Sequence, residues 1–339
     1  MWTENQSLLP YNTFGIDVRC ARFAEYDSET RLRAILDALR RDHPGESVLC
    51  VGAGSNLLFT RDYPGTVLHS NITRWAADVR DDGTAYVIAG SGWVWDEFVD
   101  FCVRNGWYGL ENLSYIPGTV GASAVQNIGA YGAEAEQFIE RVAAIELATG
   151  ETRVFTHDEL RYAYRQSAFK QELRGRYAVT TVTFRLSTTF RPATGYGSLG
   201  REIAARGLEG KLTPQALRQL IIDIRRAKLP EPTELGNGGS FFVNPVISRE
   251  AFALLQADYP AAPHYDVEGG VKVPAGWLIE QCGWKGRRLG PAGVYERQAL
   301  VLVNHGGATG ADIVALSDAV RDTVRAKFGI EIQPEVNFI

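Results

Sequence analysis

A glycine-rich stretch is the part of the chain best suited to bind a phosphate group. Six glycines lie between Gly106 and Gly132, where the overall composition predicts about three. Glycines let backbone N–H groups approach a pyrophosphate closely, and the side chains of Ser123 and Asn127 could add neutral donors. The other interpretation is a long packed loop with tight turns. The stretch is therefore either a ligand cradle or a structural loop.

A second candidate region places cations near a hydroxyl group. Apolar residues repeat at helical spacing and predict a helix over 214–228, whose last turn contains Arg225 and Lys228. These cations could cap the negative end of the helix dipole or bind a phosphate. Beyond them, the glycine-rich loop 236–239 presents Ser240 just before two phenylalanines.

The elements that must position these groups include both helices and strands. The spacing of Leu and Ile predicts a helix over 29–41, and a short buried strand follows at 48–51. Further elements are expected as a strand at 86–89, a helix at 94–104, a hairpin formed by 142–147 and 152–155, and a strand at 179–186. The region 201–325 has the pattern of a separate α+β unit.

The glycines after the first buried strand do not form a dinucleotide-binding turn. A G-x-G-x-x-G fingerprint that starts at Gly52 would need glycine at position 57, where Leu57 stands. Only a few residues follow before Asp62 and Pro64, so the long helix of a Rossmann turn is also missing. A Rossmann fold is therefore excluded for this segment.

The composition describes a folded globular protein without a cationic surface excess. The 339 residues are 45% hydrophobic and 22% charged, and the formal net charge is −5. These values exclude a disordered or fibrous chain, and they argue against wrapping of nucleic acid. The length suggests two or three compact units.

Membrane insertion, secretion and metal binding are not expected. No apolar run approaches the ~20 residues needed to span a bilayer, and the first residues lack the basic and apolar regions of a secretory signal. We therefore expect a cytoplasmic protein. The four cysteines and five histidines show no metal-ligand spacing, so no metal site is predicted.

Several motifs together resemble those of the UDP-N-acetylenolpyruvoylglucosamine reductase family, which are flavoenzymes of early peptidoglycan synthesis. The clearest are Ile116-Pro117-Gly118-Thr119-Val120-Gly121 and Gln126-Asn127-Ile128-Gly129-Ala130-Tyr131-Gly132. Others follow in the family's order over nearly the whole chain: Asn12 to Ile16, Gly52 to Asn56, Tyr164 to Ser167, Lys228 to Pro230, Gly236 to Phe242, Ala275 to Ile279, and Pro334 to Val336.

The resemblance implies an α+β fold with a flavin domain of the vanillyl-alcohol-oxidase type. Two subdomains, at 1–70 and 71–200, would bind FAD, and an α+β domain at 201–325 would bind the substrate. The tail 326–339 would return to the first subdomain or to the active site. The absence of a Rossmann turn agrees with this fold.

The resemblance also implies which residues hold FAD, noncovalently. Glycyl N–H groups and hydroxyls would neutralise the pyrophosphate without cations. By position, the cradle would consist of Gly52, Gly54, Ser55, Asn56, Pro117, Gly118, Thr119, Val120, Gly121, Ser123, Asn127, Gly129, Ala130 and Tyr131.

The implied reaction saturates the enol-ether double bond of an enolpyruvyl UDP-sugar, with NADPH as electron donor. Ser240, at the family's acid position, would supply the proton. Arg165 would hold the enolpyruvyl carboxylate with a planar pair of donors. Glu335 would be protonated and donate to the developing enolate, or would orient the site. Their structural alternatives are a turn hydroxyl, a surface arginine and a solvated tail residue.

Four further residues match substrate positions of the family. Tyr196, in Gly195-Tyr196-Gly197, matches the tyrosine of the subclass whose extra loop covers the substrate diphosphate. Arg225, Lys228 and Asn244 match UDP-binding positions. The partners implied are the UDP-sugar and NADPH, and the chain is expected to be a monomer.

Two other classes of function share part of this pattern. A flavin oxidase of the same fold often tethers its flavin through His or Cys, but neither residue occurs between Val103 and Arg153. A non-catalytic flavin- or nucleotide-binding module would keep the glycines but would not need Arg165, Ser240 and Glu335 together. Both alternatives are therefore less favoured than the reductase.

Overall fold

The computed structural model describes residues 1–197 and 199–339 and divides into two compact units. The first unit contains residues 1–6, 20–53 and 64–225, and the second contains residues 7–19, 54–63 and 226–339. Both units are assembled from segments far apart in the sequence. The predicted boundaries at residues 70, 200 and 325 remain a prediction.

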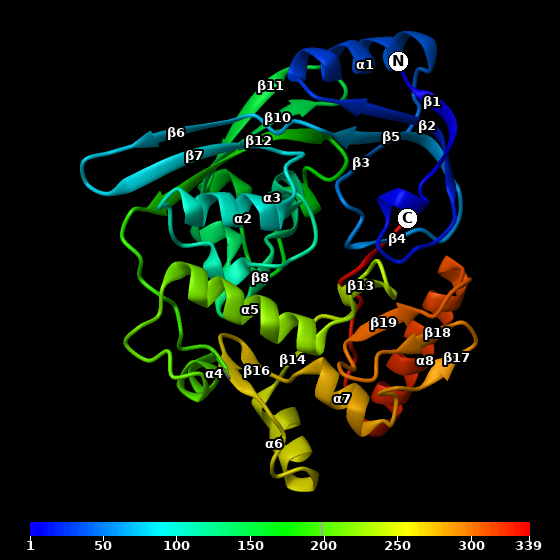
Figure 1. Ribbon diagram of the computed structural model, residues 1–339. Helices are drawn as coiled ribbons and strands as arrows, with labels where there is room; N and C mark the ends of the chain where they lie inside the picture. Colours follow the sequence, from blue (N-terminus) through cyan, green and yellow to red (C-terminus); the bar gives the residue numbers. More distant parts are fainter. Residues whose placement is uncertain (198) are drawn as a thin grey trace. The chain divides into compact units, whose positions relative to one another are not determined.

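The centre of the first unit is a five-stranded antiparallel sheet in the order β11-β10-β12-β7-β6. Two helices, α2 (Trp95–Arg104) and α3 (Val120–Gln126), lie against one face of it (Figure 1). Fully buried residues such as Val87, Phe98 and Phe184 fill the space between them. The strands are β6 (Trp75–Val79), β7 (Thr84–Gly90), β10 (Ile139–Glu146), β11 (Thr152–Thr156) and β12 (Tyr177–Ser187).

The first unit also contains a four-stranded sheet, in the order β1-β2-β5-β3. Helix α1 (Glu29–Asp42) begins after Ser28, whose side chain accepts a hydrogen bond from the Arg31 amide. Its buried face, including Leu32 and Leu36, packs on this sheet and on Ile145 of β10. The strands are β1 (Thr3–Ser7), β2 (Arg19–Tyr26), β3 (Val48–Val51) and β5 (Tyr63–Ser70).

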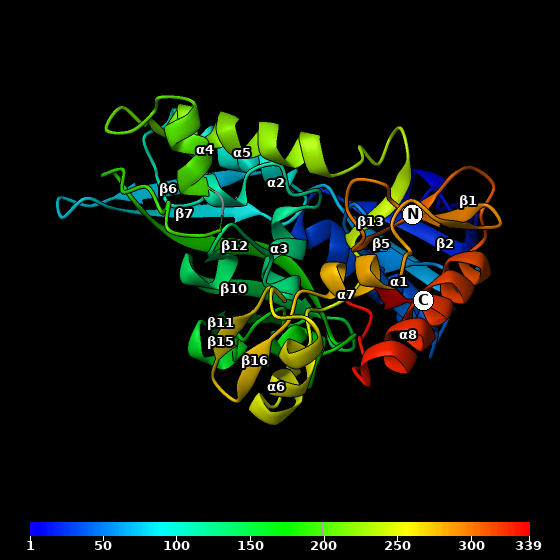
Figure 2. The ribbon, with the colours of Figure 1, turned by 90° about the horizontal axis from the view of Figure 1, so that it is seen from below.

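Two further helices complete the first unit. Helix α4 (Leu199–Ala205) packs its Leu199 and Ile203 on α5 (Pro214–Lys228). Helix α5 lies beside α2, to which it is tied by an ion pair between Arg218 and Asp96 (Figure 2). The short strands β8 (Gly129–Ala130) and β9 (Ala133–Glu134) form a tight hairpin.

The second unit is built on the four-stranded sheet β13-β19-β18-β17, against which α8 (Gly310–Phe328) packs. Helix α8 begins with a capping box and ends at Gly329 in the left-handed conformation. The other elements are β4 (Leu57–Leu58), β13 (Gly236–Ser240), β14 (Val246–Ile247), α6 (Arg249–Asp258), β15 (Tyr265–Val267), β16 (Gly270–Lys272), α7 (Ala275–Gln281), β17 (Arg288–Leu289), β18 (Ala292–Val294), β19 (Val301–Asn304) and β20 (Asn337–Phe338).

Most of the expected elements are confirmed, but several elements of the structure, including helices α3, α4, α6, α7 and α8, were not expected. The helices expected at 29–41, 94–104 and 214–228 correspond to α1, α2 and α5. The hairpin over 142–155 corresponds to β10 and β11. Helix α3, however, lies in the middle of the glycine-rich stretch, so this stretch is not simply a loop.

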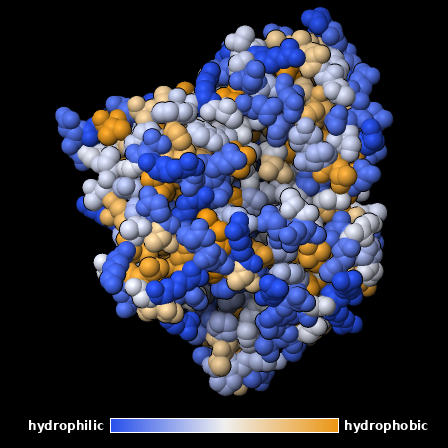
Figure 3. Space-filling model, in the orientation of Figure 1, coloured by the Kyte–Doolittle hydropathy of each residue, from blue (hydrophilic) through white to orange (hydrophobic). Residues whose placement is uncertain are grey.

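The surface contains apolar side chains among polar ones. Polar and apolar residues are interspersed on the face shown in Figure 3, as is normal for a folded protein. Among the described residues, no helix combines the length and the apolar character that crossing a bilayer requires.

Candidate functional site

Two of the predicted cofactor segments meet inside the first unit. A Cβ atom built on Gly52 would lie 2.7 Å from the Oγ1 atom of Thr119, which places the end of β3 directly against the start of α3. The turn after β7 joins them, because a Cβ atom on Gly121 would lie 2.7 Å from the Cβ atom of Ser91. A side chain at either position would collide with these atoms, so glycine permits the close contact.

Backbone donors without a protein acceptor gather at this meeting point. The N–H groups of Gly52, Ala53, Gly118 and Thr119 donate to no other described residue. Buried backbone N–H groups in folded proteins are nearly always paired, and these residues are buried or half-buried. Donors in two adjoining segments are thus available to a ligand that accepts hydrogen bonds. The neutral donors fit a pyrophosphate, and therefore the predicted FAD.

Other residues of the predicted cradle have structural contacts in the first unit. The Val120 side chain is fully buried in the core, and its carbonyl accepts a hydrogen bond of 2.7 Å from the Ser123 hydroxyl. The Asn127 amide donates to Glu134 at 2.8 Å and to the Ala163 carbonyl at 3.0 Å. These side chains therefore hold the shape of the cradle.

Arg165 lies against the same cradle. It is in a two-residue turn, because Ala163 and Gln166 exchange both backbone hydrogen bonds. Its guanidinium group donates to the carbonyls of Asn127, at 3.3 Å, and Gly129, at 2.5 Å. The structure therefore places the predicted carboxylate-binding arginine beside the predicted cofactor loop.

Arg165 and three residues near it have left-handed backbone conformations. The φ angles are 59° at Tyr115, 49° at Asn127, 49° at Tyr131 and 57° at Arg165. Non-glycine residues in this region each cost about 1–3 kcal/mol, and such residues cluster at functional sites. The positive φ angles thus mark the same part of the first unit as the unpaired backbone donors.

Arg225 faces this group from helix α5. Its Nε atom donates to the Tyr115 carbonyl at 2.9 Å. Removal from water lowers the pKa of Arg225, and the nearby Arg165 guanidinium lowers it further, against the opposing effects of Tyr131 and Asp96. A bound anion beside Arg225 would offset both the loss of water and the effect of Arg165, and so would stabilise the charged form of Arg225.

The helix that carries Arg225 is fixed by residues that the sequence patterns did not reveal. Arg218 donates to both carboxylate oxygens of Asp96, at 2.6 and 3.0 Å, and to Asp100 at 3.2 Å. Asp96 also accepts the amide of Tyr115, whose carbonyl holds Arg225. The spacing of Asp96 and Asp100 on one face of a predicted helix was the available signal.

Tyr196 lies on the connection between β12 and α4. A Cβ atom on Gly132 would come within 2.8 Å of the Cβ atom of Tyr196, so the tyrosine rests directly on the β8–β9 turn. Its side chain is 47% exposed, which leaves it accessible to a ligand. Tyr131 and Ala130 belong to the same turn.

In the second unit, backbone pairing brings Ser240 and Glu335 together. The Glu335 amide donates to the Phe241 carbonyl at 2.8 Å, and the Val243 amide donates to the Gln333 carbonyl at 2.9 Å. The chain that follows Ser240 therefore pairs with the tail that carries Glu335. Ser240 is exposed at the end of β13 and Glu335 is half-buried.

Asn56 is also next to this pair. Its side-chain amide donates to the Glu335 carbonyl at 3.3 Å, and its own carbonyl accepts the Asn337 amide at 3.0 Å. Gly54, with a φ of +64°, and Ser55 precede it in the same unit. The segment 54–56 therefore supports the tail at the position of Glu335.

The two remaining predicted substrate residues also lie in the second unit. The Asn244 side chain accepts the Ala275 amide at 2.9 Å, at the start of α7. Lys228, the last residue of α5, is exposed. Arg165 and Ser240 belong to different units.

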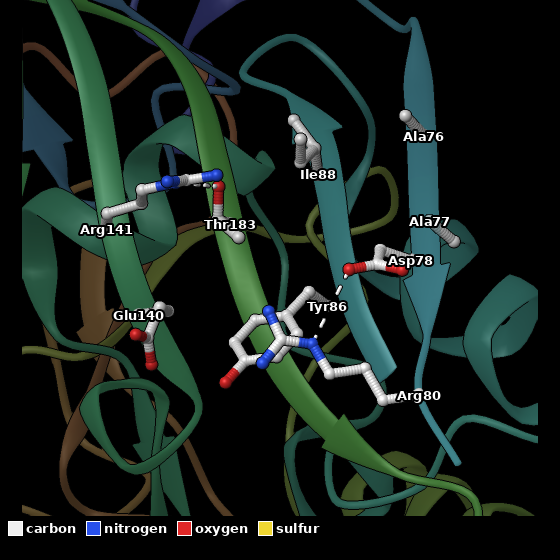
Figure 4. Close-up of a pocket in the computed structure, with 9 residues that line it drawn as sticks. All are labelled: Ala76, Ala77, Asp78, Arg80, Tyr86, Ile88, Glu140, Arg141 and Thr183. Carbon is white, nitrogen blue, oxygen red and sulfur yellow. Dashed lines mark hydrogen bonds and ion pairs between the residues drawn. The ribbon is translucent and has the colours of Figure 1, made fainter. Parts of the chain in front are cut away.

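A pocket of about 440 Å³ lies elsewhere, on the face of the five-stranded sheet opposite α2 and α3 (Figure 4). Tyr86 and Thr183 line it and alternate along their strands with buried core residues. Arg80 pairs with Asp78 at 3.6 Å and covers the Tyr86 ring. None of the predicted site residues lines this pocket.

Glu111 is a buried carboxyl group beside the cradle, and its ionisation should affect stability. Its side chain accepts the Gly109 amide at 2.9 Å, while its Oε1 atom has no hydrogen-bond partner among the described residues. Burial raises the pKa of Glu111, and the backbone hydrogen bonds only partly oppose this. The folded protein therefore favours the protonated acid.

We expect the wild type to lose stability relative to Glu111→Gln as the pH rises. The loss should begin above a pH of about 4.3, the ordinary pKa of Glu. It should be complete once the pH has passed the raised pKa that Glu111 has in the folded protein. Urea unfolding between pH 4 and pH 9 measures the difference. Glu97→Gln, which removes an exposed carboxylate of α2, is the control. A gap between wild type and Glu111→Gln that does not change with pH would contradict the prediction.

Comparison with known proteins first identifies the chain as a flavoprotein. Residues 21–156 match the profile of an FAD binding domain, which confirms the predicted cofactor. Residues 231–339 match the profile described as UDP-N-acetylenolpyruvoylglucosamine reductase, C-terminal domain. The flavin domain and the second domain thus agree with the fold class predicted from the sequence.

Similar proteins of known name then establish the family to which the chain belongs. A UDP-N-acetylenolpyruvoylglucosamine reductase of Bacteroides fragilis is 52% identical over 337 residues, which cover 99% of both chains. One from Burkholderia ambifaria is 49% identical and covers 97% of this chain and 96% of the relative. The chain belongs to the UDP-N-acetylenolpyruvoylglucosamine reductase family, as the sequence motifs predicted.

Solved structures confirm the fold. The reductase of Thermus caldophilus has a TM-score of 0.68 at 21% identity and covers 100% of this chain and 99% of its own. A solvent-stable cholesterol oxidase has a TM-score of 0.51 at 14% identity and covers 99% of this chain and 86% of its own. The second likeness shows that the fold extends to oxidases.

Proposed function

We propose that this protein reduces the enolpyruvyl double bond of UDP-N-acetylglucosamine enolpyruvate to give UDP-N-acetylmuramate, a peptidoglycan precursor. The electron donor is NADPH and the cofactor is noncovalently bound FAD. The observation that carries the proposal is the pairing of the Ser240 and Glu335 segments in a chain with an FAD binding domain. A tether to the flavin would need a His or Cys, and neither occurs between Val103 and Arg153.

The backbone donors of the first unit would hold the cofactor. Gly52, Ala53, Gly118 and Thr119 present N–H groups without a protein acceptor, which suit the pyrophosphate. When bound, FAD would accept hydride from NADPH and pass it to the terminal vinyl carbon of the substrate. The cofactor supplies this step of the reaction, and the side chains supply binding and the proton.

Ser240 would deliver the proton. Hydride addition leaves carbanion or enolate character on the neighbouring carbon, which takes a proton from the Ser240 hydroxyl and completes the saturated bond. The net reaction consumes one hydride and one proton. Glu335 would be protonated and donate a hydrogen bond to the developing enolate, or else would orient the site. Arg165 would hold the carboxylate through its planar donors.

The remaining residues would bind the UDP-sugar. Tyr196, Arg225, Lys228 and Asn244 are assigned to this role, with Tyr196 over the diphosphate. The electrostatic coupling of Arg225 to Arg165 supports an anion beside them. The reaction is assigned to the cytoplasm, and the working unit is a monomer.

Spectroscopy of the purified protein tests the proposal. The protein should be yellow, should bleach on anaerobic addition of NADPH, and should recover its colour when the enolpyruvyl UDP-sugar is added. Acid precipitation should release all the flavin. The yellow colour of an oxidase would return with oxygen but not with the UDP-sugar, and the flavin of a binding module would not be bleached by NADPH. Either result would reject the reductase, and flavin left on the acid pellet would reject noncovalent binding.

A further inference from the structure

Asn112 connects two parts of the first unit that have separate tasks in the proposed reaction. It lies in the short 3-10 helix 111–113 and is only 3% exposed. Its side-chain nitrogen donates to the Tyr131 carbonyl at 2.9 Å and to the Ala193 carbonyl at 2.8 Å. One amide group thus uses both of its N–H bonds on carbonyls that are 62 positions apart in the sequence.

The first of these carbonyls belongs to the predicted cofactor turn. Tyr131 is at the tip of the β8–β9 hairpin and has a φ of 49°. Gly132 follows with a φ of +81° and lies against Tyr196. A hydrogen bond to the Tyr131 carbonyl therefore helps to hold a strained turn in the conformation that supports Tyr196.

The second carbonyl belongs to the loop that carries Tyr196, here defined as residues 188–197. At its start, Phe190 packs edge-on against Tyr108, with ring centroids 5.7 Å apart. Beyond the loop, Leu199 at the start of α4 is buried. Most residues of 191–197 are exposed, so the hydrogen bond from the buried Asn112 to the Ala193 carbonyl fixes the middle of the loop to the interior of the unit.

The chemistry of this position is specific to a primary amide. Two carbonyl oxygens need two N–H bonds from one small group, and neither an aspartate nor a leucine of similar volume can supply them. An aspartate would also place its charge against two carbonyl oxygens. Asparagine is therefore required here for its two N–H donors. Leucine has a similar volume and could replace its packing but not its hydrogen bonds.

We infer that Asn112 is a positioning residue that holds the Tyr196 loop against the cofactor turn and thereby supports the binding of the substrate diphosphate. The inference rests on the proposed function for the role of Tyr196. Its structural part, the link between loop and turn, does not depend on that function.

Hydrogen–deuterium exchange of the holoenzyme tests the structural part without any substrate. In Asn112→Leu, the amides of 188–197 should exchange about tenfold faster than in the wild type, which corresponds to about 1.4 kcal/mol. Asn105→Leu is the matched control, because it removes a side-chain amide that donates to the Phe101 carbonyl at the end of α2. Unchanged exchange in the loop would overturn the inference.

Binding and half-reaction measurements test the functional part. The Kd of the enolpyruvyl UDP-sugar, from titration of the flavin spectrum, should rise about tenfold in Asn112→Leu, while flavin reduction by NADPH should change less than twofold. Asn112→Ser, which keeps one donor, should give an intermediate Kd. Equal Kd values in all variants would overturn the role of Asn112.

The outcomes separate this inference from the proposed function. If the protein does not reduce the UDP-sugar at all, the exchange measurement still decides whether Asn112 holds the loop. If Asn112→Leu fails to fold or to retain FAD, Asn112→Ser is measured in its place. Faster loop exchange without a change in Kd would support the link between loop and turn and would overturn the role of Asn112 in substrate binding.

Discussion

Replacing Ser240 with alanine should slow reoxidation of the reduced flavin by the enolpyruvyl UDP-sugar at least ~10²-fold. A positioned general acid contributes ~10²–10⁴ in rate, or roughly 3 to 5 kcal/mol. The variant removes one hydroxyl and little volume, so FAD content and reduction by NADPH should remain normal. Stopped-flow reoxidation of pre-reduced enzyme isolates this step from NADPH binding.

The local structure explains why the expected effect is confined to this step. Ser240 is exposed and pairs with Val301 of β19, while Asn237 anchors the strand through two hydrogen bonds with Thr13. Gly239 has a φ of +70° and an ideal Cβ atom there would have no neighbour within 4 Å. The backbone that positions Ser240 therefore does not depend on its hydroxyl group.

Two further variants make the result specific. Ser240→Cys keeps a transferable proton and should retain more activity than alanine, unless the larger sulfur displaces the substrate. Ser248→Ala removes a hydroxyl of the same unit that caps α6, and it should leave reoxidation unchanged. If Ser240→Ala slows reoxidation less than tenfold with normal substrate binding, water or another side chain delivers the proton.

Sequence patterns were sufficient to predict a helix or strand where that element has one buried face. Leu32 and Leu36 recur on one side of α1, and Leu217 and Ile221 on one side of α5, so both helices could be predicted from spacing. The glycine-rich motifs also pointed to the segments that meet at Gly52 and Thr119. These features depend on residues close together in the sequence.

The parts that were not predicted depend on contacts between distant segments. Helix α3 has only seven residues, which are mostly small, and it is defined by its caps at Thr119 and the left-handed Asn127. Each unit contains segments that are far apart in the chain, so the boundaries of the units cannot be found by dividing the sequence into consecutive pieces. Asn112 is distinguished only by the two carbonyls that the fold brings to it.

Replacing Gly54 with alanine should destabilise the second unit by about 3 kcal/mol or more. The φ of Gly54 is +64°, and an ideal Cβ atom would lie 2.0 Å from the Tyr11 carbonyl oxygen and 2.7 Å from the Asn12 Cα atom. These are backbone atoms, so a change of side-chain rotamer cannot relieve the contact. The chain near Tyr11 would have to move.

That movement is opposed by the buried side chain of Asn12. It donates to the Leu8 carbonyl at 2.8 Å and to the Ile16 carbonyl at 2.9 Å, and it accepts the Ile16 amide at 2.9 Å. The next residue, Thr13, donates its hydroxyl to the Asn237 carbonyl at 2.6 Å. A shift of this loop would therefore break buried hydrogen bonds and disturb the strand that leads to Ser240.

Gly329→Ala separates the steric contact from the backbone conformation. Gly329 is in the same unit and has a φ of +66°, but an ideal Cβ atom there would have no neighbour within 4 Å. Its replacement should cost only about 1 kcal/mol. Urea unfolding followed by far-ultraviolet circular dichroism measures both variants.

The flavin content of the two variants should differ as well. Gly54 lies between Gly52, whose amide is one of the unpaired donors, and Asn56, which supports the tail at Glu335. Gly54→Ala should therefore be purified with less FAD, whereas Gly329→Ala should keep its full content. If both variants lose the same free energy of unfolding, the contact with Tyr11 does not require glycine at position 54, and the left-handed conformation alone accounts for the residue.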